Sequence, residues 1–235
     1  MKAIREAHPE AEITLFTTLP FLELAKKSSY FDDYYIDVKP KWYQLKAWAD
    51  LSRWFNTSKF DRVYDLQNND RTSLYFKLFQ TKPEWVGVAK GASHQNASPE
   101  RVKGHAFEGH KQTLALAGIS NIEVDSLTWL GSDISWYRLK TPYVVIVPGS
   151  SAKHPEKRWP AEYYGELAKY LYDTYNIYSV LIGTNQEKEP IRKIIELCPD
   201  VIDLSGKTDM EHLPALARGA IGAIGNDTGP MHVIG

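Results

Sequence analysis

The chain has 235 residues, of which 43% are hydrophobic and 24% are charged, and its formal net charge is -1. This is the composition of a folded globular protein with room for one large domain or two small ones, and the near-neutral charge argues against general nucleic-acid binding. A single cysteine, Cys198, excludes an internal disulfide framework, and the sequence holds no apolar run of the roughly 18 residues that cross a membrane.

The first half of the chain predicts strands alternating with helices. Met1–Ala7 has the pattern of the second half of a helix, and the polar segment Ala89–Lys103 predicts a surface loop. Strands are expected at Glu12–Phe16, Tyr34–Val38, Arg62–Leu66 and Trp85–Val88, and helices at Trp42–Phe55, Thr72–Phe79 and Ala106–Ala117.

The second half alternates more regularly, which indicates βαβ units and a parallel sheet. Strands are expected at Tyr143–Val147, Tyr178–Ile182, Val201–Leu204 and Ala220–Ile224, and helices at Ala161–Tyr175, Glu187–Cys198 and Met210–Arg218. Trp129–Pro142 breaks the periodicity and predicts a linker. We therefore expect a domain boundary near Lys140, with domains at residues 1–140 and 141–235.

The segment Gly225–His232, with the sequence Gly-Asn-Asp-Thr-Gly-Pro-Met-His, follows the last predicted strand and leads into a helix. Asp227 and Thr228 would lie at the mouth of this helix, where free N–H groups attract phosphate, and Gly229 would let a ligand approach the backbone. His232 would lie about one turn inside. Ordinary helix capping is the alternative, but capping needs only one such residue.

Two other polar segments of the second half follow predicted strands. Ser150 and Ser151 end the turn after Tyr143–Val147, and Lys157 precedes the next helix, where its charge would stabilise a diphosphate leaving group. Glu187 follows Tyr178–Ile182 and would accept hydrogen bonds from a ribose. The alternatives are a simple turn, a solvated lysine and a carboxylate that complements a helix N-terminus.

In the first half, a polar cluster follows the strand expected at Arg62–Leu66. Gln67, Asp70 and Arg71 are candidates for an acceptor site, with Arg71 holding an anionic group, and a helix capped at Asn69 or Asp70 explains the cluster equally well. No metal site is expected, because His105 and His110 lack a zinc-ligand spacing and no cysteine accompanies them.

The run Asp227–His232 resembles the Asp-Ser/Thr-Gly-Pro-Met-His signature of the bacterial lipopolysaccharide heptosyltransferases, glycosyltransferase family nine. The segments Pro148–Ser151 and Lys157–Pro160 match that family at the expected place upstream. The resemblance implies a GT-B fold, with two Rossmann-like domains facing each other across a cleft. It also implies an inverting enzyme that needs neither metal nor cofactor.

The same resemblance assigns roles to matching positions. The C-terminal domain would bind an ADP-sugar donor, and the N-terminal domain would bind the lipid A-core acceptor at the membrane surface. The implied donor contacts are Ser150 and Ser151 in the nucleotide loop, Lys157 on phosphate, Glu187 on ribose, and Asp227, Thr228, Gly229 and His232 on the diphosphate and sugar.

One feature of the family has no counterpart in the sequence. The family's catalytic aspartate lies in the first βα loop, which would precede Met1, so no catalytic residue is assigned. We expect a chain truncated at both ends, with an unpaired strand edge in its N-terminal sheet, that binds donor but transfers sugar slowly or not at all. Asp65 or Asp70 would be the base if transfer were robust.

These observations favour transfer of heptose from ADP-heptose to the lipopolysaccharide inner core. The protein would be cytoplasmic, either free or peripheral at the inner face of the inner membrane. Two alternatives stay open: a non-catalytic module that binds a nucleotide sugar or a partner, and another GT-B enzyme that uses a UDP-sugar.

Overall fold

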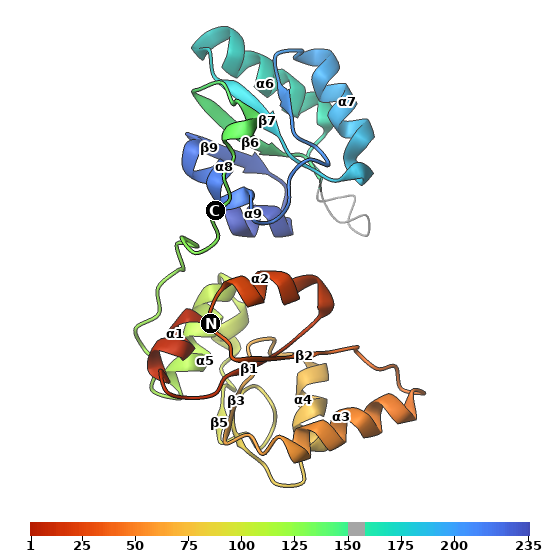
Figure 1. Ribbon diagram of the computed structural model, residues 1–235, viewed down its shortest axis with the longest axis vertical. Coiled ribbons are helices and arrows are strands. Elements are labelled where there is room, and N and C mark those ends of the chain that lie inside the picture. The colour runs from red at the N-terminus through yellow and green to blue at the C-terminus, as the bar shows by residue number, and fades with distance from the viewer. Residues whose placement is uncertain (150–157) are drawn as a thin grey trace. The chain divides into compact units, whose positions relative to one another are not determined.

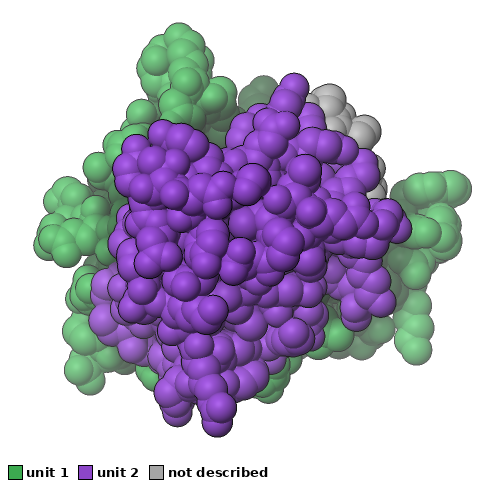
Figure 2. All heavy atoms as spheres, turned by 90° about the horizontal axis from the view of Figure 1, so that it is seen from above, with its two compact units in different colours: residues 1–125 green, residues 126–235 purple. Residues whose placement is uncertain are grey.

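The computed structural model describes residues 1–149 and 158–235, which form two compact units. Unit 1 comprises Met1–Asp125 and unit 2 comprises Ser126–Gly235. Figure 1 shows strands and helices in both units, and Figure 2 colours the units separately. Every strand pairing in the described part of the chain is parallel, so each unit is an α/β structure.

The sheet of unit 2 is centred on its first strand. Its strands are β6 (Tyr143–Val147), β7 (Tyr178–Leu181), β8 (Ile202–Asp203) and β9 (Gly222–Gly225), in the spatial order β8-β7-β6-β9. Because β6 pairs with β7 on one edge and with β9 on the other, the segments that follow these three strands leave the sheet side by side.

Helices cover both faces of this sheet, which explains why β6 is apolar at every position. They are α6 (Ala161–Tyr175), α7 (Lys188–Leu197), α8 (Leu213–Gly219) and α9 (Gly229–Ile234). Val144 and Ile146 pack with residues of α6 and α7, whereas Val145 and Val147 pack with residues of α8. All five residues of β6 are buried. The strand is therefore the centre of the core of unit 2.

Unit 1 contains a two-stranded and a three-stranded parallel sheet, in the orders β1-β2 and β3-β4-β5. The strands are β1 (Thr14–Thr17), β2 (Asp33–Ile36), β3 (Arg62–Tyr64), β4 (Glu84–Gly87) and β5 (His94–Gln95). The helices are α1 (Lys2–Ala7), α2 (Leu22–Lys27), α3 (Leu45–Thr57), α4 (Asp70–Leu78) and α5 (Ala106–Ala115).

Two apolar clusters stabilise unit 1 on opposite sides of its strands (Figure 1). One is rich in aromatic side chains from α3, α4 and β4, including Phe55, Tyr75 and Trp85. The other joins Ile4 of α1 to Leu114 of α5. The large number of aromatic residues in the sequence is thus mainly a packing feature of this unit.

The first residues of unit 2, which were predicted to be a linker, pack against the rest of that unit. Tyr137 donates a hydrogen bond from its hydroxyl to the carbonyl oxygen of Lys207 at 2.6 Å, and Arg218 donates to the carbonyl oxygens of Ser126 and Leu127 at 3.1 and 2.7 Å. Because of these contacts the compact units divide between Asp125 and Ser126, N-terminal to the boundary expected near Lys140.

The predicted elements agree with the structure best in unit 2, where β6 and α6 have the expected bounds. The prediction of a loop over Ala89–Lys103 is wrong in part. His94–Gln95 forms β5, and Pro99–Val102 forms a 3₁₀ helix in which the N–H of Glu100 donates to the side chain of Ser98. A strand of two residues is too short to leave a periodic pattern in the sequence.

No helix in the described ranges combines the length and the apolar character that a membrane span requires.

Close packing at the end of β9 leaves no room for a side chain at Gly225. A Cβ at Gly225 would lie 2.8 Å from Cβ of Val147 and 2.8 Å from Sδ of Met231, whereas a Cβ at Gly222 meets nothing within 4 Å. We expect Gly225→Ala to destabilise unit 2 by about 1–3 kcal/mol through overpacking. Chemical denaturation measures this, with Gly222→Ala as the matched control. Equal effects of the two substitutions would contradict the packing argument.

Candidate functional site

Three loops of unit 2 meet at the carboxyl edge of its sheet. Pro148 and Gly149 follow β6, Gly183–Glu187 follows β7, and Asn226–Thr228 follows β9. Since β6 lies between β7 and β9 and all three strands run in the same direction, these loops are neighbours. The carboxyl edge of a parallel sheet is the usual ligand-binding edge of open α/β folds.

The side chain of Asn226 connects two of these loops to the start of α6. It is buried, and its Nδ2 donates to the carbonyl oxygens of Pro148 at 2.8 Å and Gly149 at 3.2 Å. Its Oδ1 accepts from the backbone N–H of Trp159 at 2.9 Å and from the hydroxyl of Tyr164 at 3.0 Å. One amide thus fixes the exits of β6 and β9 relative to α6.

Sequence reasoning gave Asn226 no role. Its type and position, two residues after a predicted strand, are compatible with any turn, and turn propensity does not show which distant groups a side chain will bind. The groups that hydrogen-bond to the side chain of Asn226 lie 62–78 positions away in the sequence. Only the pairing of β6 with β9 brings them together.

Glu187 lies against the loop that follows β6. Its Oε2 accepts hydrogen bonds from the backbone N–H and the hydroxyl of Thr184, at 2.7 and 2.6 Å, in a capping box. Its Oε1 lies 3.1 Å from the position that a Cβ on Gly149 would occupy. The helix-capping interpretation of Glu187 is therefore confirmed, and the same side chain lies beside the end of β6.

Asp227, Thr228 and Gly229 lead into α9. Thr228 is the N-cap residue, yet its side chain makes no capping hydrogen bond, and its Oγ1 is a buried atom without a partner among the described residues. A Cβ at Gly229 would meet nothing within 4 Å, so the backbone there is accessible. Side-chain capping by Thr228, the alternative interpretation of this motif, is absent from the described structure.

Asp227 and His232 form a surface pair one turn apart. Oδ1 of Asp227 lies 3.3 Å from Nε2 of His232, and their side chains are 61% and 70% exposed. Both groups are thus available to a ligand at the start of α9. The other expected donor residues, Ser150, Ser151 and Lys157, lie outside the described residues.

The polar cluster of unit 1 is largely engaged in local structure. Asn69 caps α4, with its Oδ1 accepting from the N–H of Thr72 at 3.0 Å, so the capping interpretation at Asn69 is confirmed. Arg71 donates to the carbonyl oxygen of Pro40 and to the hydroxyl of Tyr75, each at 3.4 Å. The remaining candidates are exposed: Gln67, whose Oε1 accepts from Asn69 at 3.3 Å, and Asp70, the first residue of α4.

Asp65 is a buried carboxyl at the end of β3. Its Oδ1 accepts from the backbone N–H groups of Gln67 and Asn68 at 3.1 and 3.0 Å, while its Oδ2 is buried with no hydrogen-bond partner in the described part of the chain. Burial raises the pKa of Asp65 above its ordinary value of 3.8, because the charged form loses hydration. The sequence gave no sign of this burial.

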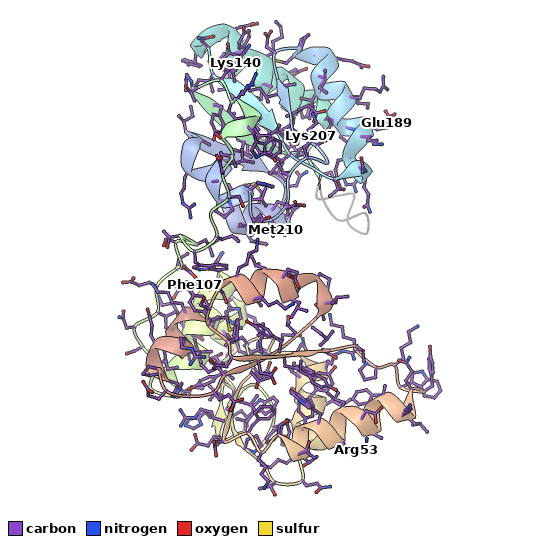
Figure 3. All side chains as sticks on the ribbon, viewed as in Figure 1. Arg53, Phe107, Lys140, Glu189, Lys207 and Met210 are labelled. Atoms are coloured by element: carbon purple, nitrogen blue, oxygen red, sulfur yellow. The ribbon has the colours of Figure 1, made fainter. Side chains whose placement is uncertain are left out.

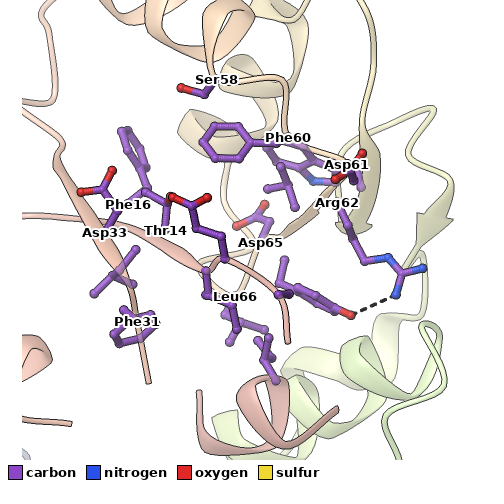
Figure 4. Close-up of a pocket in the computed structure, with 18 of the residues that line it drawn as sticks. Thr14, Phe16, Phe31, Asp33, Ser58, Phe60, Asp61, Arg62, Asp65 and Leu66 are labelled. Carbon is purple, nitrogen blue, oxygen red and sulfur yellow. Dashed lines mark hydrogen bonds between the residues drawn. The ribbon is translucent and has the colours of Figure 1, made fainter. Parts of the chain in front are cut away.

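A cavity of about 1120 Å³ lies beside Asp65 in unit 1. Figure 4 shows Thr14 and Phe16 of β1 on one side of it and Arg62, Asp65 and Leu66 on the other. Among the described residues, β1 pairs only with β2, and β3 pairs with β4 on one edge. The cavity therefore lies between two strand edges that have no pairing partner here.

The order of strands and helices around the cavity of unit 1 is the same as the order around β6 in unit 2. In unit 2, α6-β7-α7-β8 extends to one side of β6, and α8-β9 returns to its other side. In unit 1, α1-β1-α2-β2 extends to one side of the cavity, and α3-β3 lies on its other side. The cavity of unit 1 thus corresponds in topology to the place of β6 in unit 2.

The described ranges contain no cluster of three or more His, Cys, Asp or Glu residues that could hold a metal ion. His105, one of the two histidines considered above, caps α5 instead, with its Nδ1 accepting from the N–H of Phe107 at 3.2 Å.

Solved structures similar to this chain share its fold. A glycosyltransferase of family 9 from Veillonella parvula matches with a TM-score of 0.74 and 22% identity, over 99% of this chain and 71% of that one. ADP-heptose lipopolysaccharide heptosyltransferase II of E. coli matches with a TM-score of 0.67 and 20% identity, over 99% and 75%. E. coli heptosyltransferase WaaC with ADP-2-deoxy-2-fluoro heptose matches at 0.70 and 18%, over 99% and 78%.

The fold is of the GT-B type that these solved glycosyltransferases have. A family model described as glycosyltransferase family 9 (heptosyltransferase) matches residues 120–234, which include the whole edge site. The C-terminal part of the chain thus matches this family, and the N-terminal part lies outside the matched residues. A search of curated proteins finds no match to it.

The hydrogen bonds of Asn226 predict a large effect of its removal. Asn226→Ala leaves two buried carbonyl oxygens, an N–H and a hydroxyl without partners, and we expect it to destabilise unit 2 by about 2–4 kcal/mol. Asn226→Asp keeps the acceptor oxygen but places a second oxygen against the carbonyls of Pro148 and Gly149. Thermal unfolding should show a loss with both variants and none with Asn185→Ala, an exposed control. An unchanged melting temperature for Asn226→Ala would refute the role of this amide.

The burial of Asp65 predicts a pH dependence of stability. Because its pKa is higher in the folded than in the unfolded state, the stability gained from its proton is complete below pH 3.8 and is lost as pH rises through the folded-state value. Asp65→Asn keeps the acceptor for Gln67 and Asn68, so it should reduce this loss at neutral pH. Unfolding measured across pH, with Asp61→Asn as an exposed control, tests the prediction. Identical pH profiles for wild type and Asp65→Asn would contradict it.

Proposed function

We propose that unit 2 binds ADP-heptose and that the enzyme transfers heptose, with inversion and without a metal ion, to the lipopolysaccharide inner core. The observation that carries the proposal is the junction made by Asn226. Asn226 holds the loops after β6 and β9 beside each other. Glu187 lies against the loop after β6, and the accessible start of α9 follows the loop after β9. A diphosphate linked to a ribose on one side and a sugar on the other fits this order of groups.

The start of α9 is suited to the diphosphate. The N–H groups at the beginning of a helix are free to bind anions, and neither a side-chain cap from Thr228 nor a Cβ at Gly229 blocks them. Asp227 and His232 are close enough to each other to contact one ligand together. We assign these two side chains to the sugar and diphosphate.

Glu187 is proposed to contact the ribose. Its Oε2 is held by Thr184, which fixes the orientation of the carboxylate, and its Oε1 is directed toward Gly149. A carboxylate at this βα junction accepts hydrogen bonds from ribose hydroxyls in related folds. The proposed roles of Ser150, Ser151 and Lys157 in binding the nucleotide and its phosphates rest on the sequence resemblance.

The chemistry requires stabilisation of the departing ADP. Cleavage of the bond between sugar and phosphate builds positive charge on the sugar ring and negative charge on the leaving diphosphate. The start of α9 and Lys157 would stabilise that negative charge. The acceptor hydroxyl would attack the opposite face of the ring, which inverts the configuration, and it would give up its proton to a general base. On the acceptor side we propose Gln67, Asp70 and Arg71.

Two similar structures support the choice of nucleotide. The E. coli heptosyltransferase WaaC has been solved with ADP and with ADP-2-deoxy-2-fluoro heptose. Their identity to this chain is 18% and 17%, so they establish the fold, and their ligands motivate the proposal.

The proposal predicts losses of affinity on substitution of the donor residues. We expect Lys157→Ala and Asp227→Ala each to weaken ADP-heptose binding by about 1.5–3 kcal/mol, the cost of a charge-assisted contact, with the melting temperature preserved. Isothermal titration calorimetry measures this. Glu189→Gln is the matched control, because Glu189 is an exposed carboxylate of α7 paired with Arg192 at 3.1 Å (Figure 3).

Titration with ADP, UDP and ADP-heptose separates the alternatives. Preference for UDP would favour a different GT-B transferase. Tight ADP-heptose binding without heptose transfer to a lipid A-core acceptor would favour a non-catalytic binding module. Unchanged ADP-heptose affinity in both alanine variants would show that these residues serve only local structure.

A further inference from the structure

The connection between β2 and α3 projects from unit 1 (Figure 1), and together with the first residues of α3 it exposes large apolar side chains. Trp42 is 85% exposed, Leu45 75%, Val38 73% and Tyr43 56%. Single exposed apolar residues are common on protein surfaces, but four within eight positions form a patch that needs an explanation.

The same segment is basic. Residues 38–49 include Lys39, Lys41 and Lys46 and contain no aspartate or glutamate. All three lysines are exposed. The chain as a whole has a formal net charge of -1, so this concentration of positive charge is local. We call residues 38–46 the basic aromatic loop.

Hydrogen bonds hold the backbone of the basic aromatic loop in place. Trp48 donates from Nε1 to the carbonyl oxygen of Lys41 at 3.0 Å, and the N–H of Lys41 donates to Oε1 of Gln44 at 2.7 Å. The N–H of Lys39 donates to Oδ1 of Asp37 at 2.7 Å, and Arg71 donates to the carbonyl oxygen of Pro40 at 3.4 Å. The loop therefore presents its exposed side chains from a fixed frame.

The anchors of this frame extend into the core of unit 1. Asp37 is buried and accepts from the hydroxyl of Tyr75 at 3.0 Å, and burial, assisted by the nearby charge of Asp37, raises the pKa of Tyr75 to about 12. Tyr75 thus keeps its proton as a donor at neutral pH. Tyr75 and Trp48 both belong to the aromatic cluster between α3 and α4. The backbone that carries Trp42 and Tyr43 is thus anchored to packed residues of unit 1.

We propose that the basic aromatic loop docks the protein onto an anionic lipid bilayer. Tryptophan and tyrosine favour the boundary between headgroups and acyl chains, where their rings meet apolar tails and their polar atoms meet water. Lysines beside them are attracted to the negative charge of the headgroups. Charge complementarity selects an anionic membrane over a second copy of this chain, because a copy would bring another positive loop. The inference does not depend on which nucleotide sugar the enzyme uses.

Binding of the full chain to vesicles tests this proposal without any nucleotide. We expect co-sedimentation with vesicles of phosphatidylcholine containing phosphatidylglycerol, and little with phosphatidylcholine alone. Trp42→Ser with Tyr43→Ser should reduce the partition coefficient about tenfold, because buried apolar area is lost. Changing Lys39, Lys41 and Lys46 together to glutamine should reduce it about a hundredfold, since each lysine near an anionic surface contributes about fivefold.

The matched control changes Lys59, Lys77 and Lys90, three other exposed lysines of unit 1, to glutamine, and it should bind nearly as wild type. Equal losses in the two lysine triples would show diffuse electrostatic attraction and overturn the proposal. Unchanged binding of the aromatic double variant would indicate attraction to any polyanion and overturn it too. A self-associating wild type that the aromatic double variant turns into a monomer, with no vesicle binding by either, would assign the loop to a second copy.

Discussion

The site of unit 2 depends on one constraint: β6 is buried on both faces and paired on both edges. A central strand of this kind must be apolar throughout, so it cannot carry polar side chains for a ligand. The polar groups therefore lie in the loops that follow β6, β7 and β9, and the amide of Asn226 holds two of these loops together. Close packing of Gly225 against Val147 and Met231 brings the start of α9 near the same edge. Unsatisfied carbonyl oxygens in this buried junction would cost free energy, so a side chain with both donors and an acceptor is required there.

The periodic elements of this fold follow from the sequence, whereas several tertiary interactions do not. The β-branched run of β6 and the spacing of α6 predict their own bounds, because burial on two faces or on one leaves a regular pattern. The two-residue strand β5 leaves none. Glu187 and Asn69 were each compatible with capping and with ligand binding, and the structure shows capping at both without deciding the second role. The burial of Asp65 was not predictable, since it depends on packing around the end of β3 rather than on neighbouring residues.

The two units have the same order of strands and helices, but the polar residues at their sheet edges are used differently. In unit 2 the edge of the sheet has an accessible helix start and exposed polar groups, which the proposed donor site requires. In unit 1 the polar residues near the sheet edge are mostly committed to local structure: Asn69 caps α4, and Arg71 contacts Pro40. The contact of Arg71 with Pro40 holds the basic aromatic loop in place. Arg71, a candidate for the acceptor site, therefore also supports the surface that we propose to bind a membrane. A glycosyltransferase acting on a lipid-linked acceptor would benefit from both features.

The central claim is that the carboxyl edge of unit 2 is the nucleotide site, and amide hydrogen exchange with and without ADP tests it most directly. Bound ADP should slow exchange in the loops after β6, β7 and β9 and at the start of α9, because these backbone groups would be buried or hydrogen-bonded by the ligand. Peptides from unit 1, including those lining the cavity beside Asp65, should exchange unchanged. Protection confined to unit 1, or no protection at saturating ADP, would contradict the assignment of the site.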